Sequence, residues 1–169
     1  ARDGQRVTLK WGLAQSNNWI SAYLMSRLNP QDFLRILNDF GINTYGAYPS
    51  MVLCLGPNEV SVCEMVSAYT TFANHGIHCY PMFVSKIEDN EGNVVATFQP
   101  RMNEVISEES AYKMIEMLRA VMNGGTGSRM RYKYNIECDM GGKTGTTNRN
   151  ADAWFMGFTP SLVSGCWVG

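Results

Sequence analysis

Apolar residues recur at helical spacing in the first part of the chain. One predicted helix begins near the polar cluster Ser16–Asn18, and its apolar face consists of Ile20, Tyr23, Leu24 and Leu28. A second helix is predicted from Pro30, with Asn29 as its N-cap, and Gly41 is expected to end it. The two segments predict a helical hairpin, followed by a connection over residues 42–58.

Two further helices carry clearer start signals. Ser61 and Glu64 have the spacing of a capping box, in which each side chain bonds the backbone of the other residue, and Gly76 marks the end of that helix. Ser107 is the predicted N-cap of the next helix, which runs to about Asn123. The apolar stripe of this helix consists of Ala111, Met114, Ile115, Leu118, Val121 and Met122.

Strand-like segments occupy most of the remaining chain. Tyr80–Glu88 and Asn93–Phe98 flank the segment Asp89–Gly92, which is a strong hairpin signal. Beyond a glycine-rich break at residues 124–127, the sequence predicts only strands, at residues 140–147, 153–158 and 162–168. Helices together with adjacent antiparallel strands predict an α+β fold, in which helices pack on an antiparallel sheet.

Composition and charge argue against several classes of function. The net charge is −1 and the sequence pI is near 6.1. Because no basic stripe of the kind that binds nucleic acid phosphates is present, no nucleic-acid partner is expected. No apolar run approaches the roughly 18 residues that span a bilayer. Residues 1–6 lack the apolar stretch of a signal peptide.

The five cysteines are scattered singly and are predicted to behave as small buried hydrophobes: Cys54, Cys63, Cys79, Cys138 and Cys166. A disulfide between Cys54 and Cys63 stays open at this stage. Neither His75 nor His78 has a metal-ligand spacing to a cysteine, so neither a metal site nor another cofactor is predicted. Since no Gly-x-Ser-x-Gly elbow occurs, a Ser-His-Asp hydrolase is not favoured either.

The strongest local signal for chemistry is Gly141–Thr147. A phosphate-binding loop would require a glycine at position 137, which is Glu137, and would open a helix rather than lead toward strands. The favoured interpretation is an edge strand that lines an active site. Such a strand can pair with an extended peptide, while a lysine attracts a carboxylate.

Alternation along this strand places Lys143 and Gly145 on one face, and Thr144 and Thr146 on the other. Asp152 follows the loop of residues 148–150. Its carboxylate is expected to fix that loop rather than to perform chemistry.

The triplet Ser16-x-Asn18 changes the interpretation of the strand. Read alone, Ser16 is a helix cap and Asn18 a solvated first-turn residue. However, Ser-x-x-Lys, Ser-x-Asn and Lys-Thr-Gly, in that order, are the signature set of penicillin-binding proteins and related β-lactamases. The last two motifs stand here in that order, as Ser16-x-Asn18 and Lys143-Thr144-Gly145.

The resemblance extends over nearly the whole chain. The segments that look like transpeptidase segments are Leu13–Asn18, Glu59–Gly76, Gly125–Arg129, Gly141–Asn148 and Asp152–Pro160. In detail they most resemble the class A, bifunctional penicillin-binding proteins. The resemblance implies a partial serine transpeptidase or β-lactamase-like fold over residues 1–169.

The resemblance also implies roles for single residues. Ser16 would relay protons to the leaving amine, and Asn18 would hydrogen-bond the peptide substrate and the catalytic lysine. Lys143 would orient the substrate and polarise the Ser16 hydroxyl. Substrate binding is implied for three strand residues, Thr144, Gly145 and Thr146. The first two would shape the strand, and the third would bind the terminal carboxylate while its backbone N–H serves the oxyanion hole.

One family motif is missing from the chain. Ser-x-x-Lys normally lies several tens of residues before Ser-x-Asn, and the fifteen residues before Ser16 do not contain it. The resemblance therefore implies a domain truncated at both ends, which lacks the nucleophilic serine and is inactive by itself. Ser110 and Lys113 have the right spacing on one helix face. Because they follow Ser-x-Asn and lie beside Glu109 and Glu116, they are interpreted as ordinary surface residues.

The expected function of the parent protein is cross-linking of peptidoglycan stem peptides by acyl transfer from a D-alanyl-D-alanine donor, and β-lactam antibiotics would acylate it. The resemblance implies an upstream glycosyltransferase domain, a membrane anchor and a location on the outer face of the bacterial cytoplasmic membrane. Two alternatives remain open: a non-catalytic cell-wall or protein-binding module, and a β-lactam sensor or β-lactamase of the same fold. Truncation would expose apolar surface and thus predicts self-association.

Overall fold

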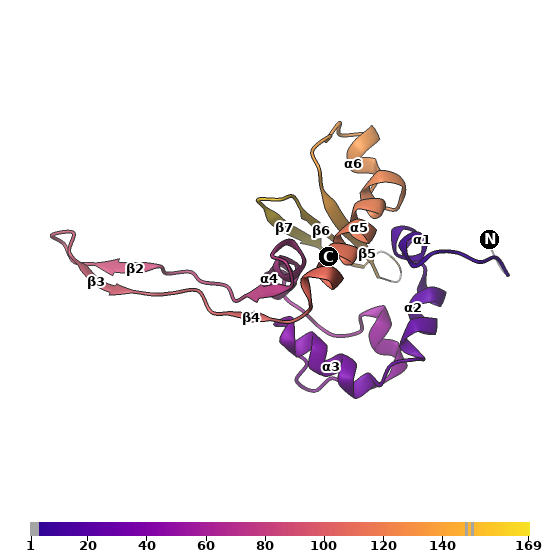
Figure 1. Ribbon diagram of the computed structural model, residues 1–169, viewed down its shortest axis with the longest axis horizontal. Helices are drawn as coiled ribbons and strands as arrows, with labels where there is room; N and C mark the ends of the chain where they lie inside the picture. Colours follow the sequence, from indigo (N-terminus) through magenta and orange to yellow (C-terminus); the bar gives the residue numbers. More distant parts are fainter. Residues whose placement is uncertain (1–3, 148, 150) are drawn as a thin grey trace.

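The computed structural model describes residues 4–147, 149 and 151–169. It confirms an α+β arrangement, in which helices pack around an antiparallel sheet and a long two-stranded arm extends to one side (Figure 1). The helices are α1 (Leu9–Ala14), α2 (Asn18–Met25), α3 (Pro30–Asp39), the 3-10 helix η1 (Met51–Leu55), α4 (Val62–Ala73), α5 (Glu108–Gly124) and α6 (Arg129–Tyr132).

The central sheet consists of three consecutive antiparallel strands, β5 (Gly141–Thr146), β6 (Ala153–Phe158) and β7 (Val163–Val168), in the order β5-β6-β7. Lys143 is paired with Met156, which in turn is paired with Gly165. The order confirms the prediction that the strand containing Lys143 lies at a sheet edge.

Helices α4 and α5 pack against this sheet. A Cβ on Gly142 of β5 would lie 3.0 Å from the Met122 sulfur of α5, and a Cβ on Gly165 of β7 would lie 2.8 Å from Val66 of α4. Met122 and Val121 are fully buried and form one core cluster with Met140. A second cluster joins α2, α3 and η1 and consists of Met25, Leu34 and Leu53.

The arm begins at the paired strands β1 (Ile77–Cys79) and β4 (Met102–Glu104) and continues into the hairpin of β2 (Lys86–Glu88) and β3 (Val94–Thr97). Asp89 Oδ1 accepts hydrogen bonds from the backbone N–H groups of Glu91 and Asn93. The predicted hairpin is thus confirmed, although β4 was not predicted.

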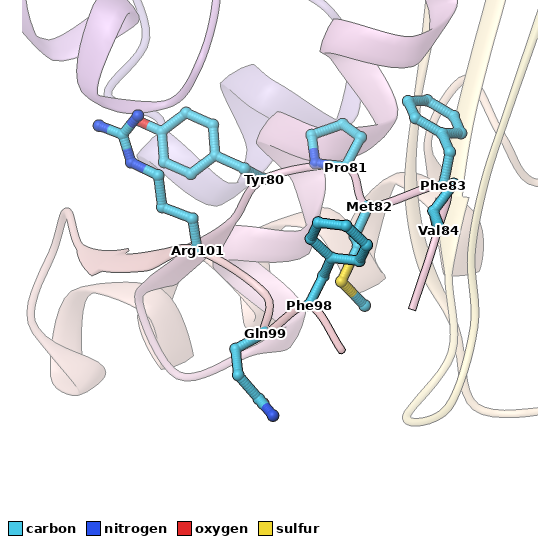
Figure 2. Close-up of a pocket in the computed structure, with 8 residues that line it drawn as sticks. All are labelled: Tyr80, Pro81, Met82, Phe83, Val84, Phe98, Gln99 and Arg101. Atoms are coloured by element: carbon cyan, nitrogen blue, oxygen red, sulfur yellow. The ribbon is translucent and has the colours of Figure 1, made fainter. Parts of the chain in front are cut away.

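The prediction of a strand from Tyr80 onward is wrong, because β2 starts at Lys86. Pro81 and Pro100 lie on the two chains of the arm in this region, and a proline cannot donate a ladder hydrogen bond. The chains separate here around a shallow pocket of about 320 Å³. Figure 2 shows its lining, in which the Arg101 guanidinium lies 4.4 Å from the centre of the Tyr80 ring.

Most predicted helix starts are confirmed. Asn29 caps α3, Ser61 and Glu64 form the capping box of α4, and Ser107 caps α5. The helix predicted to begin near Ser16–Asn18 is confirmed as α2, but Ser16 is not its cap, and α1 was not predicted. Two helices, α1 and α2, lie in this region, and the N-cap of α2 is Asn17, whose Oδ1 accepts a hydrogen bond from Ile20 N.

The prediction that only strands follow residue 127 is also wrong, because α6 precedes β5. Arg131 explains the difference. Its guanidinium donates to the carbonyl oxygens of Ile136 and Cys138, both at 2.6 Å, and its Nε donates to Asn123 Oδ1. These bonds fold the connection back on α5, which no alternation of apolar residues could predict.

The prediction of buried cysteines is wrong as well. Cys54 and Cys79 are half-buried, the other three are exposed, and all five are free thiols. The thiol side chain is too small to force its position inward when larger apolar neighbours fill the core. In the described part of the chain, no helix is both long and apolar enough to cross a membrane.

Candidate active site

Lys143 and Ser16 lie 127 positions apart in the sequence and form a direct hydrogen bond. The Lys143 ammonium donates to Ser16 Oγ at 2.8 Å and to the carbonyl oxygen of Thr144 at 2.6 Å. Because the Ser16 oxygen accepts from the ammonium, the hydroxyl proton of Ser16 stays available for donation. A hydroxyl held in this way can pass a proton to a neighbouring group.

Ser16 occupies a special backbone position between α1 and α2. Its φ is 50°, in the left-handed region, directly before the N-cap Asn17. Because Asn17 provides the cap, the Ser16 hydroxyl does not bond its own helix and points to the lysine instead. Such strained positions cost free energy and are common at functional sites.

The environment of Lys143 leaves its charge unneutralised. The side chain is half-buried, and burial lowers the pKa of its ammonium. Among the described residues, no carboxylate forms an ion pair with it. A partly desolvated ammonium without a counter-ion favours the binding of an anionic group such as a carboxylate.

The other predicted strand residues follow Lys143 along β5. The hydroxyl oxygens of Thr144 and Thr126 form a hydrogen bond of 2.6 Å. A Cβ on Gly145 would lie 3.2 Å from Trp154 Cβ. Thr146 is exposed at the end of the strand. Since β5 is an edge strand, the backbone groups on its open side can pair with an extended ligand.

Asn18 is the first residue of α2 and is exposed, two positions after Ser16. Within the described residues, no hydrogen bond joins it to Ser16 or Lys143. The structure thus brings Ser16 and Lys143 together and places Asn18 nearby in the chain without a direct contact to the pair.

Asp152 lies at the end of the loop between β5 and β6 and forms hydrogen bonds with Thr147 and Trp167. Its Oδ2 accepts from Thr147 Oγ1 at 2.8 Å and its Oδ1 accepts from Trp167 Nε1 at 3.0 Å, while its own N–H donates to Thr147 Oγ1 at 2.8 Å. These contacts agree with the predicted role in fixing the loop. Asn148 and Asn150 of that loop lie outside the described residues.

Sequence reasoning missed the contact of Thr126 with the strand that carries Lys143. The segment around it resembled the family, but nothing within a few residues of it indicated a contact with Thr144. Ser110 and Lys113 behave as predicted for surface residues, since Ser110 Oγ accepts from Ser107 Oγ and Lys113 bonds Glu109 at 2.5 Å.

A second serine, Ser67, lies 2.8 Å from His78 Nε2 but is no candidate for catalysis. Both side chains are buried, and Ser67 donates to the carbonyl oxygen of Cys79. His75 is exposed and bonds Glu108. No group of three or more His, Cys, Asp or Glu side chains in the described chain is arranged to hold a metal ion.

Comparison with known proteins agrees with this geometry. Residues 1–164 match the penicillin binding protein transpeptidase domain. The chain is 37% identical over 163 residues to penicillin-binding protein 1A of Aquifex aeolicus (strain VF5), which covers 96% of this chain and 22% of that protein. The chain therefore spans about a fifth of the length of this relative.

Solved structures show the same fold. Penicillin-binding protein 1A from Haemophilus influenzae superposes with a TM-score of 0.88 at 26% identity, over 100% of this chain and 33% of that one. The PonA1 protein from Mycobacterium tuberculosis in complex with penicillin V superposes with a TM-score of 0.83 at 27% identity, over 99% of this chain and 49% of that one. The resemblance drawn from the motifs is thereby confirmed, and the chain belongs to the penicillin-binding protein transpeptidase domain family.

Proposed function

We propose that this chain is the part of a peptidoglycan DD-transpeptidase that supplies the proton relay, the site lysine and the substrate-binding strand. The observation that carries the proposal is the 2.8 Å hydrogen bond from Lys143 to Ser16 Oγ, which joins the two family motifs present in the sequence. The nucleophile would be the serine of a Ser-x-x-Lys motif that precedes Ser-x-Asn, and the fifteen residues before Ser16 do not contain one.

In the proposed acylation step, the serine oxygen attacks the carbonyl carbon of the D-alanyl-D-alanine peptide bond. The serine proton is taken up by the base of the Ser-x-x-Lys motif, and the C–N bond breaks. Ser16 gives its proton to the leaving amine and is reprotonated through the same relay, so free D-alanine departs and an ester remains. In the second step, the amine of another stem peptide attacks the ester carbon, the C–O bond to the serine breaks, and a proton from the amine returns through the relay to the serine oxygen.

Lys143 has two tasks in this scheme. Its ammonium holds the Ser16 oxygen as an acceptor, so the hydroxyl proton is directed to the reacting nitrogen. Its unneutralised charge also attracts the terminal carboxylate of the donor peptide, which Thr146 would bind at the exposed end of β5. The edge of β5 would align the peptide by backbone pairing.

β-Lactam antibiotics would react at the same place. Their strained amide takes the position of the scissile peptide bond, and their carboxylate takes the position of the terminal carboxylate. The ring nitrogen stays attached after the amide bond breaks, so the leaving group does not depart and the ester blocks attack by the second peptide.

The parent protein is proposed to act on the outer face of the bacterial cytoplasmic membrane, with a glycosyltransferase domain and a membrane anchor in the same polypeptide. The relatives that match this chain are several times longer, which leaves room for both. The present chain by itself is proposed to be inactive, because no Ser-x-x-Lys serine precedes Ser16 and Ser110 is a surface residue.

The proposal is tested with a fluorescent penicillin followed by peptide mass spectrometry. The reagent is added to this chain and to a version extended by about 80 residues upstream, a length that restores one layer of helix and strand. We expect labelling of the extended protein alone, on an upstream serine. Labelling of Ser110 in the short chain, or of neither protein, would contradict the proposal.

Two lysine variants sharpen the test. Lys143→Met in the extended protein is expected to lower the acylation rate by about 100-fold or more, as is typical when a charge-stabilising group is removed. Lys113→Met is the matched control, because Lys113 is an exposed lysine that also has a hydrogen-bond partner. Its acylation rate should equal that of the unaltered protein.

A further inference from the structure

The segment Gly124–Gly127 lies between the two halves of the active-site pair. It begins with the last residue of α5 and contacts both the chain that leads to Ser16 and the strand that carries Lys143. No other chemistry was assigned to this segment from the sequence. Its contacts suggest how two residues so far apart in sequence are kept within hydrogen-bonding distance.

On the Ser16 side, two hydrogen bonds fix the segment to the end of α1. The backbone N–H of Thr126 donates to the carbonyl oxygen of Ala14 at 3.0 Å. The Gln15 side chain donates to the carbonyl oxygen of Gly124 at 3.1 Å. Ala14 and Gln15 immediately precede Ser16, so these bonds fix the backbone from which the Ser16 hydroxyl projects.

On the Lys143 side, the Thr126 hydroxyl forms a 2.6 Å hydrogen bond with the Thr144 hydroxyl. Side chains alternate along a strand, so Thr144 and Gly142 share one face of β5 and Lys143 lies on the other. A Cβ on Gly142 would lie 3.0 Å from Met122 of α5, so the face of Thr144 is the one toward α5. Ser16 thus bonds Lys143 on one face of β5, and Thr126 bonds the adjacent residue, Thr144, on the other face.

The two glycines that flank Thr126 are tightly packed. A Cβ on Gly125 would overlap the carbonyl oxygen of Ala14 and would lie 2.8 Å from Val121 Cα. A Cβ on Gly127 would lie 2.7 Å from the Met122 sulfur. Only glycine permits backbone to approach backbone this closely, so the position of Thr126 is fixed by packing on α1 and α5.

We propose that Thr126 is a positioning residue of the transpeptidase reaction, which holds the Lys143–Ser16 pair together by bonding Thr144 and Ala14 at once. The inference rests on the proposed function, because it names the residue that sets the geometry of the proposed proton relay. Thr126 acts through its neighbours and does not touch the reacting atoms.

The size of the effect follows from the geometry of hydrogen bonds. The Lys143–Ser16 hydrogen bond has a length of 2.8 Å, and an increase of this distance by less than 1 Å would break it. Displacements of this size at a catalytic group can lower a rate by about 100-fold. Removing one hydroxyl that holds the strand is expected to have part of that effect, a decrease of about 3- to 30-fold.

The experiment compares Thr126→Val, Thr126→Ser and a matched control in the upstream-extended protein. Valine keeps the shape of threonine and removes the hydroxyl, whereas serine keeps the hydroxyl. The control is Thr44→Val, which removes a hydroxyl that accepts a hydrogen bond of the same 2.6 Å length, from Asn38 of α3. The rate of acylation by a fluorescent penicillin is measured as a function of reagent concentration, which separates binding from the acylation step.

A second readout follows the titration of the Lys143 side chain by NMR, both in the extended protein and in this chain. We expect Thr126→Val to slow the acylation step with little change in reagent binding, and to shift the Lys143 titration. Thr126→Ser should restore both, and Thr44→Val should change neither. Thermal unfolding of each variant shows whether it is folded.

Several results would overturn the inference. If Thr126→Val acylates as fast as the unaltered protein, Thr126 does not position the pair, whether or not the titration moves. If serine fails to restore a slowed rate, the hydroxyl is not the group that acts. Should the unaltered extended protein not be acylated at all, the proposed function fails. The Lys143 titration then still decides whether Thr126 positions this lysine.

Discussion

The Asp152 carboxylate accepts a hydrogen bond from the Trp167 indole at 3.0 Å and thereby joins the start of β6 to the end of β7. The same carboxylate accepts from Thr147, directly after β5. One side chain thus connects all three strands of the sheet at the end where Thr146 is exposed. The sheet depends on Asp152 for the geometry of this end.

Asp152→Ala is therefore expected to lower the free energy of unfolding by about 1 kcal/mol, because two exposed hydrogen bonds to the carboxylate are lost and water takes over only part of each. Thermal or urea unfolding of this chain measures the effect. Glu137→Ala removes an exposed carboxylate outside the sheet and serves as the control. Equal stabilities of the two variants would show that the carboxylate does not hold the sheet.

We expect the acylation rate of the extended protein to fall at alkaline pH because Lys143 loses its proton there. The lysine must be protonated to donate to Ser16, and burial lowers the pKa of its ammonium. Activity should therefore fall as the pH rises through a value below the ordinary pKa of lysine, about 10.4.

Lys143→Arg tests this assignment, because arginine stays protonated over the accessible pH range. The variant is expected to be slower, since its planar group fits the site poorly, but its rate should no longer fall on the alkaline side below about pH 10. An alkaline limb that is identical in both proteins would assign the titration to another group.

His78 predicts a loss of stability in mild acid. Its Nε2 lies 2.8 Å from Ser67 Oγ, which itself donates to Cys79 O, so Nε2 carries the proton that Ser67 accepts. The ring packs against Tyr80, and a Cβ on Gly41 would lie 2.8 Å from Nε2. In this interior, burial lowers the pKa of His78, and the neighbouring Asn103 side chain acts against this shift.

A histidine whose pKa is lower in the folded state binds more protons when unfolded. The neutral His78 ring thus contributes fully to the free energy of unfolding above about pH 6.5, the pKa of histidine in the unfolded chain. The contribution is lost as the pH falls through the pKa of the folded state, with a slope of at most about 1.4 kcal/mol per pH unit. Urea unfolding from pH 7.5 to 5 measures the slope. His78→Gln should reduce it, whereas His75→Gln, which alters an exposed ring, should leave the contribution of His78 unchanged. Equal slopes in both variants would contradict this origin.

Two adjacent glycines at the end of α5, Gly124 and Gly125, allow a matched pair of substitutions that tests how tightly the segment Gly124–Gly127 packs. A Cβ on Gly124 meets nothing within 4 Å, whereas a Cβ on Gly125 overlaps Ala14 O. Gly124→Ala is expected to be neutral or to stabilise by up to about 1 kcal/mol, since alanine favours helix more than glycine does. Gly125→Ala should destabilise by about 1–3 kcal/mol, as overpacking does. Thermal unfolding compares the two, and similar shifts would mean that α1 moves away without cost.

The arm predicts self-association of this chain. Phe83 is 86% exposed, and Val95 is 67% exposed on the opposite chain of the arm. Large exposed apolar surface of this kind commonly mediates association. Sedimentation velocity is expected to show concentration-dependent association, which Phe83→Ser should weaken. Tyr45→Ser alters an even more exposed ring outside the arm and serves as the control. Monomers at every concentration, or equal effects of both variants, would exclude the arm as the cause.

The sequence by itself determined those elements whose signals are local. Asn29 with Pro30, Ser61 with Glu64, and Ser107 each fix a helix start through bonds that reach only two or three residues. The turn at Asp89 is equally local. The identity of the site was also readable, because the two family motifs stand in a fixed order that does not depend on knowing the fold.

Tertiary structure decided everything that depends on contacts between distant segments. Asn17 rather than Ser16 caps α2, because the Ser16 hydroxyl bonds Lys143, which lies in the distant strand β5. The pairing of β1 with β4 joins segments separated by the whole arm. The bond between Thr126 and Thr144 likewise arises only when α5 packs on the sheet. Such contacts are set by the packing of side chains in three dimensions, which periodicity along the chain does not encode.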